Sequence, residues 1–251
     1  TQMPQVVQYI LELRQAYPDG FLTFYTNGYP SSWGWRPWSG PSMKTMAPAL
    51  DLVIASAYTE SNDTAPGFPK EAASCTEPCA VTSLPTVEAA VGHGNGGWDE
   101  YVPRSKLVLA VGWFMREWGM NASLPLAQRG DPLGGRISYC QAIGLRKSLH
   151  KDAVGKPRLD KASGTWSFTC RHDPHNASTF NSCGPHESPN DQEYEVWHDD
   201  AESSRPKFEA VKSAGWRGIG MWQADGMWPY ADDIHNISLW PACKPELEAA
   251  W

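Results

Sequence analysis

The sequence has no apolar run long enough to span a bilayer, and it is poor in basic residues. Only 21 lysines and arginines stand against 28 aspartates and glutamates, which gives a formal net charge of −7. This balance argues against nucleic acid or an anionic membrane as a partner. The chain also lacks a Gly-x-Ser-x-Gly elbow, a glycine-rich phosphate loop ending in Gly-Lys-Ser/Thr, and a His-Glu-x-x-His pair. Three common signatures of enzyme sites are therefore missing.

No signal peptide precedes Thr1, yet other features favour an oxidising secretory route. The chain has six cysteines, and sequons for N-glycosylation begin at Asn62, Asn121, Asn176 and Asn236. An even number of cysteines together with four sequons favours disulfides and surface glycans, in a pairing that the sequence leaves open. We therefore expect either a mature form or a fragment whose start lies upstream.

Helical and strand-like segments alternate along the chain. Helices are predicted at residues 4–17, 43–50 and 203–215, and buried strands at 21–26, 51–57, 106–113 and 216–222. This alternation favours an α/β fold with a parallel sheet. Since a complete (β/α)8 barrel needs eight strands and roughly 250 residues before insertions, four strands supply about half a barrel.

Two long stretches interrupt this pattern. Residues 61–97 are predicted as one long loop, because they contain prolines and glycines and show no clear periodicity. Residues 115–194 hold two sequons, three cysteines and many polar residues, and are predicted as an insertion, with a small sheet as one form for it. The predicted organisation is thus one partial barrel over residues 1–251, with an insertion at about 115–194.

The strand at 216–222 ends on a large aromatic residue, Trp222. Gly218 and Gly220 are expected where a neighbouring backbone approaches closely. In a parallel α/β barrel, side chains at the carboxyl ends of the strands face the active site. An indole there offers a flat surface on which a pyranose ring stacks. Since the chain has 13 tryptophans, packing in the core is the alternative.

Two blocks of sequence resemble the last βα unit of glycoside hydrolase family 18. Residues 196–200 read Val-Trp-His-Asp-Asp, and residues 217–224 read Arg-Gly-Ile-Gly-Met-Trp-Gln-Ala. Both blocks and their spacing match that unit, and the resemblance extends more weakly over most of the chain. It implies the C-terminal part of a TIM barrel, with strands 5–8 and an insertion between strand 7 and the last helix. A lysosomal or secreted location is implied too.

The family's catalytic acid is the Glu of an Asp-x-x-Asp-x-Asp-x-Glu motif after the fourth barrel strand, and this motif is absent from the chain. The resemblance implies that the strand at 21–26 corresponds to the fifth, so that the catalytic strand would lie just upstream of Thr1. The nearest acidic cluster, at residues 191–202, has the wrong spacing. We expect that cluster to be a solvated acidic surface.

The resemblance implies a substrate-assisted mechanism, in which the sugar's own 2-acetamido oxygen attacks the anomeric carbon. Tyr58 matches the family's tyrosine after the sixth strand and is expected to donate a hydrogen bond to the acetamido carbonyl. Ser56 and Thr59 stand where the family has Met and Asp, which puts family-typical activity in doubt. A structural hydrogen bond is the alternative role for Tyr58, and Glu60 is a nearby candidate for substrate binding.

Four further residues complete the candidate substrate site. Trp222 is expected to form the floor of the subsite that holds the reacting sugar. Trp113 closes the strand at 106–113 and either lines the pocket or packs in the core. Gln223 stands where the resemblance leads us to expect Asn, and Asn27 lies at the mouth of the strand at 21–26.

No cofactor and no metal ion are expected. A cluster of potential ligands contains Cys170, His172, His175, Cys183 and His186. Their order and spacing fit no common zinc finger, and a sequon at residue 176 puts the segment on a surface. A disulfide with surface histidines is the favoured interpretation.

The function implied is a chitinase-like glycosidase that hydrolyses β-1,4-linked N-acetylglucosamine oligosaccharides, here without its proton donor. These oligosaccharides are the expected partner, with no nucleic acid and no membrane. A non-catalytic chitinase-like lectin that keeps Trp222 is the alternative. A third interpretation is a truncated product that does not fold, because four strands cannot close a barrel and leave open edges.

Overall fold

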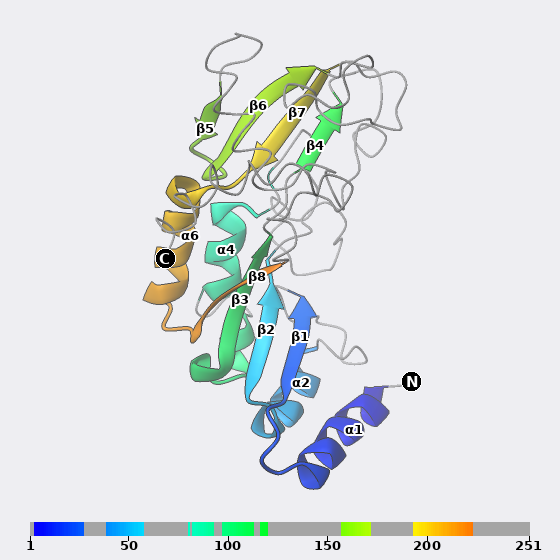
Figure 1. Cartoon of the computed structure of the whole chain (residues 1–251). Helices are drawn as coiled ribbons and strands as arrows, with labels where there is room; N and C mark the ends of the chain where they lie inside the picture. The colour runs from blue at the N-terminus through cyan, green and yellow to red at the C-terminus, as the bar shows by residue number, and fades with distance from the viewer. Residues whose placement is uncertain are drawn as a thin grey trace.

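The computed structural model describes residues 3–27, 39–57, 80, 82–92, 97–112, 116–119, 157–171 and 193–222. These segments form two four-stranded sheets, one parallel and one antiparallel. Figure 1 shows that the parallel strands β1, β2 and β3 point toward the antiparallel sheet, which lies beyond their carboxyl ends. The predicted α/β fold with a parallel sheet is confirmed.

The parallel sheet has the strand order β1-β2-β3-β8. Its strands are β1 (Thr23–Asn27), β2 (Leu52–Ser56), β3 (Leu107–Gly112) and β8 (Gly218–Trp222). Each of them overlaps one of the four segments for which the sequence predicts a strand, so all four predictions are confirmed. The neighbours pair in parallel register throughout.

The helices pack on one face of this sheet. They are α1 (Met3–Ala16), α2 (Gly40–Met46), α4 (Leu84–Val91) and α6 (Ala201–Ser213), with the short 3-10 helices η1 (Ala47–Ala49), η2 (Trp98–Glu100) and η3 (Arg104–Lys106). Alternate residues of β2 and β3 enter the same buried cluster as the helices; they are Val53, Ala55, Leu107, Leu109 and Val111. The period-two alternation of a strand therefore turns the intervening residues to the other face.

Helix α4 corrects the prediction of one long loop over residues 61–97, which is wrong for residues 84–91. Ser83 caps the helix, because its side chain accepts a hydrogen bond from the Thr86 amide at 3.3 Å. Pro85 occupies the first turn, where its missing N–H costs nothing. Both signals are present in the sequence, but the helix is only eight residues long, and so short a run gives little periodicity.

Strand β1 lies at one edge of the parallel sheet, and the prediction that it is a buried strand is only partly right. Thr26 is buried, but Tyr25 is 46% exposed, and Phe21, just before the strand, is 71% exposed. Among the described residues β1 pairs with β2 alone. An apolar run in the sequence indicates that a strand is hydrophobic, but it does not indicate how many strands lie beside it. The burial of an edge strand was therefore overestimated.

The antiparallel sheet follows β3 in the chain and precedes α6. Its strands are β4 (Arg116–Gly119), β5 (Arg158–Asp160), β6 (Thr165–Arg171) and β7 (Glu193–His198), in the order β4-β7-β6-β5. It falls where the sequence predicts an insertion, although β7 runs four residues past the predicted end at 194. Trp118 of β4 and Trp197 of β7 form a small buried cluster with Ala80.

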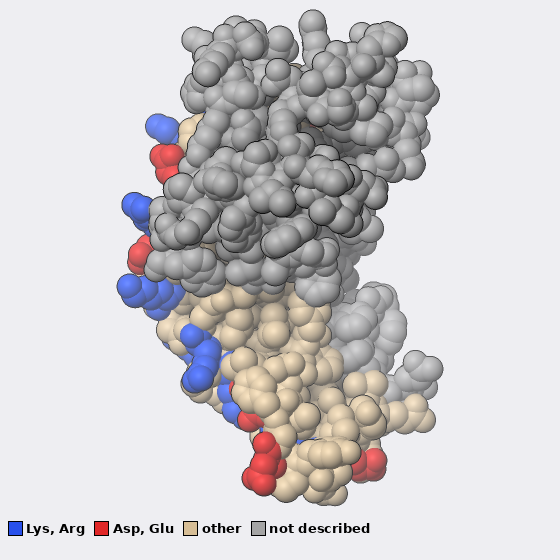
Figure 2. All heavy atoms as spheres, in the orientation of Figure 1, with Lys and Arg blue, Asp and Glu red and all other residues tan. Residues whose placement is uncertain are grey.

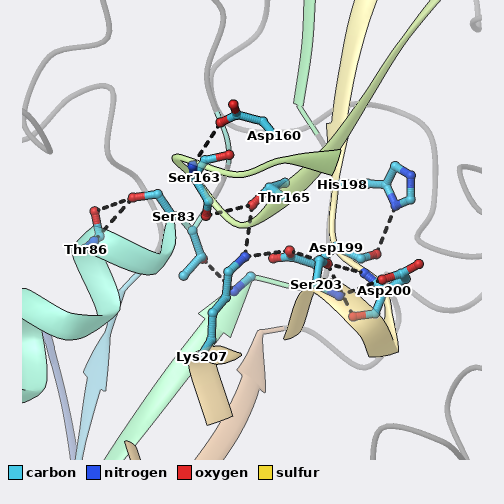
Figure 3. A network of polar contacts seen from close by, with 12 residues as sticks. Ser83, Thr86, Asp160, Ser163, Thr165, His198, Asp199, Asp200, Ser203 and Lys207 are labelled. Carbon is cyan, nitrogen blue, oxygen red and sulfur yellow. Dashed lines mark hydrogen bonds and ion pairs between the residues drawn. The ribbon is translucent and has the colours of Figure 1, made fainter. Parts of the chain in front are cut away.

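A buried lysine joins α6 to the antiparallel sheet (Figure 3). Lys207, on α6, is 1% exposed. Its Nζ lies 2.5 Å from Asp199 Oδ1 and 3.0 Å from the hydroxyl of Thr165, the first residue of β6. The Ser203 hydroxyl donates to the same Asp199 oxygen at 2.8 Å. The cation is thus held both by the residue that follows β7 and by the start of β6.

The predicted solvated acidic surface at residues 191–202 is wrong for its two central members. Asp199 is 6% exposed and is paired with Lys207, whereas Asp200 is 2% exposed and caps the N-terminus of α6. Asp200 Oδ1 accepts from the Ser203 amide at 2.8 Å, and the Asp200 amide donates to Ser203 Oγ at 2.9 Å. This reciprocal cap satisfies amides that have no partner within a helix. The pattern of charges in the sequence did not indicate that Lys207, eight residues after Asp199, would pair with it.

Helix α1 is tied to the parallel sheet by one arginine and one aspartate. Arg14 Nη2 lies 2.6 Å from Asp51 Oδ2, and the same oxygen accepts from the Leu22 amide at 2.7 Å. Arg14 Nε also donates to the Ala49 carbonyl at 2.9 Å. The hydrogen bond from Leu22, and then that from Arg14, lower the pKa of Asp51 below its usual value.

We predict that Asp51→Asn lowers the melting temperature at pH 7 and that its effect depends on pH. Because the pKa of Asp51 is lower in the folded state, its stabilising effect is present above the unfolded pKa and is lost as pH falls through the folded one. The difference from wild type should therefore narrow below about pH 4. Thermal unfolding followed by circular dichroism from pH 7 to pH 3 measures this. A difference that stays constant over that range would contradict the assigned cause.

We predict that Lys207→Met lowers the free energy of unfolding by about 3–5 kcal/mol, since it leaves the Asp199 carboxylate buried without its cation. Lys212, on the same helix, is exposed. Lys212→Met is thus a matched control, expected to change stability by no more than about 0.5 kcal/mol. Urea unfolding of both variants checks this. Equal effects of the two substitutions would show that the ion pair is not a main support of the fold.

Candidate functional site

The carboxyl ends of the parallel strands bring together the positions that the sequence analysis singled out. Asn27, the last residue of β1, is paired with Ser56, the last residue of β2. Ser56 is paired with Ala110, and Ala110 with Gly220. Two residues farther along, Gly112 is paired with Trp222. In parallel α/β barrels this edge of the sheet carries the active site.

The alternation along each strand decides which face these positions share. Val53, Ala55, Leu109 and Val111 enter the core beneath the helices. Positions 27, 56, 112 and 222 are out of phase with them in register and therefore lie on the face turned away from the helices. We call this the inner face.

The inner face is uncharged and, near β8, has little side-chain bulk. Its positions on β1, β2 and β3 include Tyr25, Leu52, Ile54, Ser56, Val108 and Ala110. In the view of Figure 2 the described surface over the parallel strands is largely uncharged, and lysine and arginine side chains lie along one margin. An uncharged face matches a neutral ligand better than a phosphate or a nucleic acid.

The two glycines of β8 do not have the role predicted from the sequence. Within the described residues, a Cβ added at Gly218 would meet nothing within 4 Å, and one added at Gly220 would meet Val108 Cγ1 at an ordinary 3.5 Å. Neither glycine of β8 therefore has a closely approaching backbone among the described residues. The two glycines instead place no side chain of their own on the inner face beside β3.

Sequence reasoning missed one residue of the inner face, Tyr25. Its ring is 46% exposed, and its hydroxyl is hydrogen-bonded to the Ser56 side chain. Partial burial raises the pKa of the Tyr25 phenol, and the bond from Ser56 offsets this in part. The phenol is therefore neutral at physiological pH. The two-residue alternation of a strand could have indicated Tyr25, because Tyr25 lies two residues before Asn27 and therefore on the same face.

Four of the six predicted site residues lie outside the described residues. They are Tyr58, Glu60, Trp113 and Gln223. Each follows the end of a described strand, β2, β3 or β8, by at most four residues in the chain. For Asn27 and Trp222 the structure gives the backbone position at the edge. The roles assigned to all six residues stay predictions.

The metal cluster weighed in the sequence analysis is almost wholly outside the described segments, and only the backbone of Cys170 is placed, in β6. Among the residues that the structure covers, no group of three His, Cys, Asp or Glu side chains could hold a metal ion. Over the same residues, none of the helices combines the length and the apolar character that a membrane crossing requires.

Comparison of the sequence with curated proteins finds a partial relative. The chain is 36% identical over 152 residues to di-N-acetylchitobiase of Mus musculus, a match that covers 57% of this chain and 37% of that protein. No family model matches the sequence.

Comparison of the fold with solved structures finds chitinases. A chitinase from Chromobacterium violaceum matches with a TM-score of 0.56 at 16% identity, over 98% of this chain and 62% of that chain. A GH18 chitinase from Cycas revoluta in complex with (GlcNAc)3 matches with a TM-score of 0.54 at 14% identity, over 89% of this chain and 57% of that chain. At these identities the likeness concerns the fold. The chain spans about a third to three fifths of the length of these proteins.

Proposed function

We infer a role in recognising chitin-type sugars from the similarity of this chain to glycoside hydrolase family 18, which was predicted from residues 196–200 and 217–224 and is confirmed by the comparisons. We propose that β-1,4-linked N-acetylglucosamine oligosaccharides bind at the carboxyl edge of the parallel sheet. The observation that carries this proposal is the register, which aligns Asn27 with Ser56 and Gly112 with Trp222 at one edge.

The proposed chemistry is substrate-assisted hydrolysis with retention. The acetamido oxygen of the sugar attacks its own anomeric carbon while an acid protonates the leaving oxygen. In this scheme Tyr58 donates a hydrogen bond to the acetamido carbonyl and holds that group in line for attack. Trp222 forms the floor under the reacting sugar, and Trp113, Gln223, Asn27 and Glu60 line the site.

The two buried carboxylates of the acidic cluster at residues 191–202 do not offer a replacement for the family's proton donor. Asp199 is held by Lys207 and Ser203, and Asp200 caps α6. Both carboxylates are thus committed to the junction between the two sheets. Since the family's acidic motif is not part of these 251 residues, the chain by itself is proposed to bind the oligosaccharide without cleaving it.

A non-catalytic sugar-binding protein is the second candidate function. It is favoured by Thr59, which stands where the family has an aspartate beside its tyrosine. Losing that carboxylate removes a group that stabilises the charge developing on the acetamido unit, but leaves a stacking surface at Trp222. Binding without hydrolysis is therefore common to both candidates for this chain, and the activity of a longer form distinguishes them.

We predict that the chain binds tri-N-acetylchitotriose and that Trp222→Ala weakens binding at least about tenfold, because the stacking surface is lost. Isothermal titration calorimetry measures the affinity, and the release of N-acetylglucosamine measures hydrolysis. Trp216→Phe is the matched control, because Trp216 is buried beneath the helices and away from the edge. It should leave the affinity unchanged.

Cellotriose serves as the ligand control, since it has the same linkage and lacks acetamido groups. Equal affinity for the two trisaccharides would contradict recognition of the acetamido group. No binding of either would remove the proposed function. Hydrolysis of the chitotriose by this chain would contradict the expectation that it lacks a proton donor. It would indicate that one of its own residues acts as the acid.

A further inference from the structure

We infer that Thr82 is a positioning residue for the carboxyl edge of β3 and β8, an inference that rests on the sugar-binding function proposed above. Thr82 is fully buried. Its hydroxyl oxygen accepts a hydrogen bond from the Gly112 amide at 3.3 Å. Gly112 is the last residue of β3 and the register partner of Trp222.

The strand geometry explains why Gly112 needs this acceptor. The Ala57 amide donates to the Ala110 carbonyl at 2.9 Å, so Ala110 directs its backbone groups toward β2. Gly112 is two residues farther along and directs its amide to the same side. There β2 has already ended, at Ser56. A buried amide left without an acceptor is costly, and Thr82 supplies the oxygen that β2 no longer provides.

The oxygen is well placed because both sheets hold the segment that carries it. Ala80 packs with Trp118 and Trp197 on the antiparallel sheet. On the other side of Thr82, the Leu84 amide donates to the Ser163 carbonyl in the β5–β6 turn at 2.7 Å. Thr82 is therefore fixed between two anchors, and it in turn fixes the end of β3.

The adjacent Ser83 has a different task, although it too is a hydroxyl residue. Figure 3 shows its side chain directed at Thr86 in the first turn of α4. It accepts from the Thr86 amide at 3.3 Å and donates to the Thr86 hydroxyl at 3.0 Å. Ser83 thus stabilises the first turn of α4. It offers a control of similar size one residue away.

A hydroxyl that fixes this strand end acts on Trp222 through the backbone. The chain of contacts runs from Thr82 to Gly112 and across the ladder to Trp222. A binding group must be held within a fraction of an ångström of its working place by the residues behind it. Loss of the Thr82 hydroxyl should therefore make the position of Trp222 in the proposed sugar site less fixed, although no residue of the site itself is replaced.

The test compares Thr82→Val, Thr82→Ser and Ser83→Ala by calorimetry with tri-N-acetylchitotriose and by thermal unfolding. Thr82→Val should weaken binding roughly tenfold. Thr82→Ser keeps the hydroxyl and should bind within about threefold of wild type. Ser83→Ala should lower the melting temperature through loss of the cap while leaving affinity within about twofold of wild type. Equal losses of affinity in Thr82→Val and Ser83→Ala would overturn the inference, because the loss in Thr82→Val would then be explained by a general loss of fold stability.

Hydrogen exchange provides a readout that needs no sugar. The Gly112 amide should exchange faster in Thr82→Val than in wild type or in Ser83→Ala. Unchanged exchange would overturn the inference even if the wild type binds the trisaccharide. Faster exchange together with no binding by the wild type would keep Thr82 as the support of the strand end and reject the proposed function. If Thr82→Val does not fold, Thr82→Ala takes its place, since it places no extra methyl group against the amide.

Discussion

The buried ion pair of Lys207 and Asp199 is the contact on which the arrangement of the two sheets depends. A charge removed from water is tolerated only when an opposite charge and hydrogen bonds compensate it. Here the lysine comes from α6, which packs on the parallel sheet, whereas its partners are the residue after β7 and the first residue of β6. Neither sheet can shift along the other without exposing one of these groups. The pair thus fixes the antiparallel sheet at the carboxyl end of the parallel one.

That arrangement gives the parallel sheet two faces with different tasks. The helix-facing residues of β2 and β3 are aliphatic and fully buried, so they supply the hydrophobic stabilisation. The inner face carries Tyr25, Ser56, Ala110 and two glycines; Tyr25 is half exposed, whereas Ser56 and Ala110 are buried. The uncharged inner face and the aromatic position at its edge are consistent with a neutral sugar as the ligand.

Two residues near this edge differ from the pattern of glycoside hydrolase family 18, and both carry hydroxyl groups. Ser56 and Thr59 replace a methionine and an aspartate that accompany the family's tyrosine. In this structure Ser56 is hydrogen-bonded to Tyr25 on the neighbouring strand. The serine is therefore part of a local hydroxyl pair that the family pattern does not predict. Such a pair retains polar contacts for a sugar but supplies no carboxylate to stabilise a developing positive charge.

The sequence by itself determined the four parallel strands, three of the helices and the resemblance from which we propose a sugar site at the edge, because hydrophobic periodicity and short motifs are local properties. It missed α4, whose cap was visible but whose length was too short for periodicity, and it misjudged β1 and Asp199. Only the tertiary structure decided that Asp199 is buried against Lys207, that Tyr25 shares a face with Ser56, and that Thr82 reaches Gly112. Each of these contacts joins residues from different parts of the fold, and the Asp199–Lys207 pair is completed by Thr165 of β6. Burial and pairing depend on which elements pack together, and local sequence does not record that.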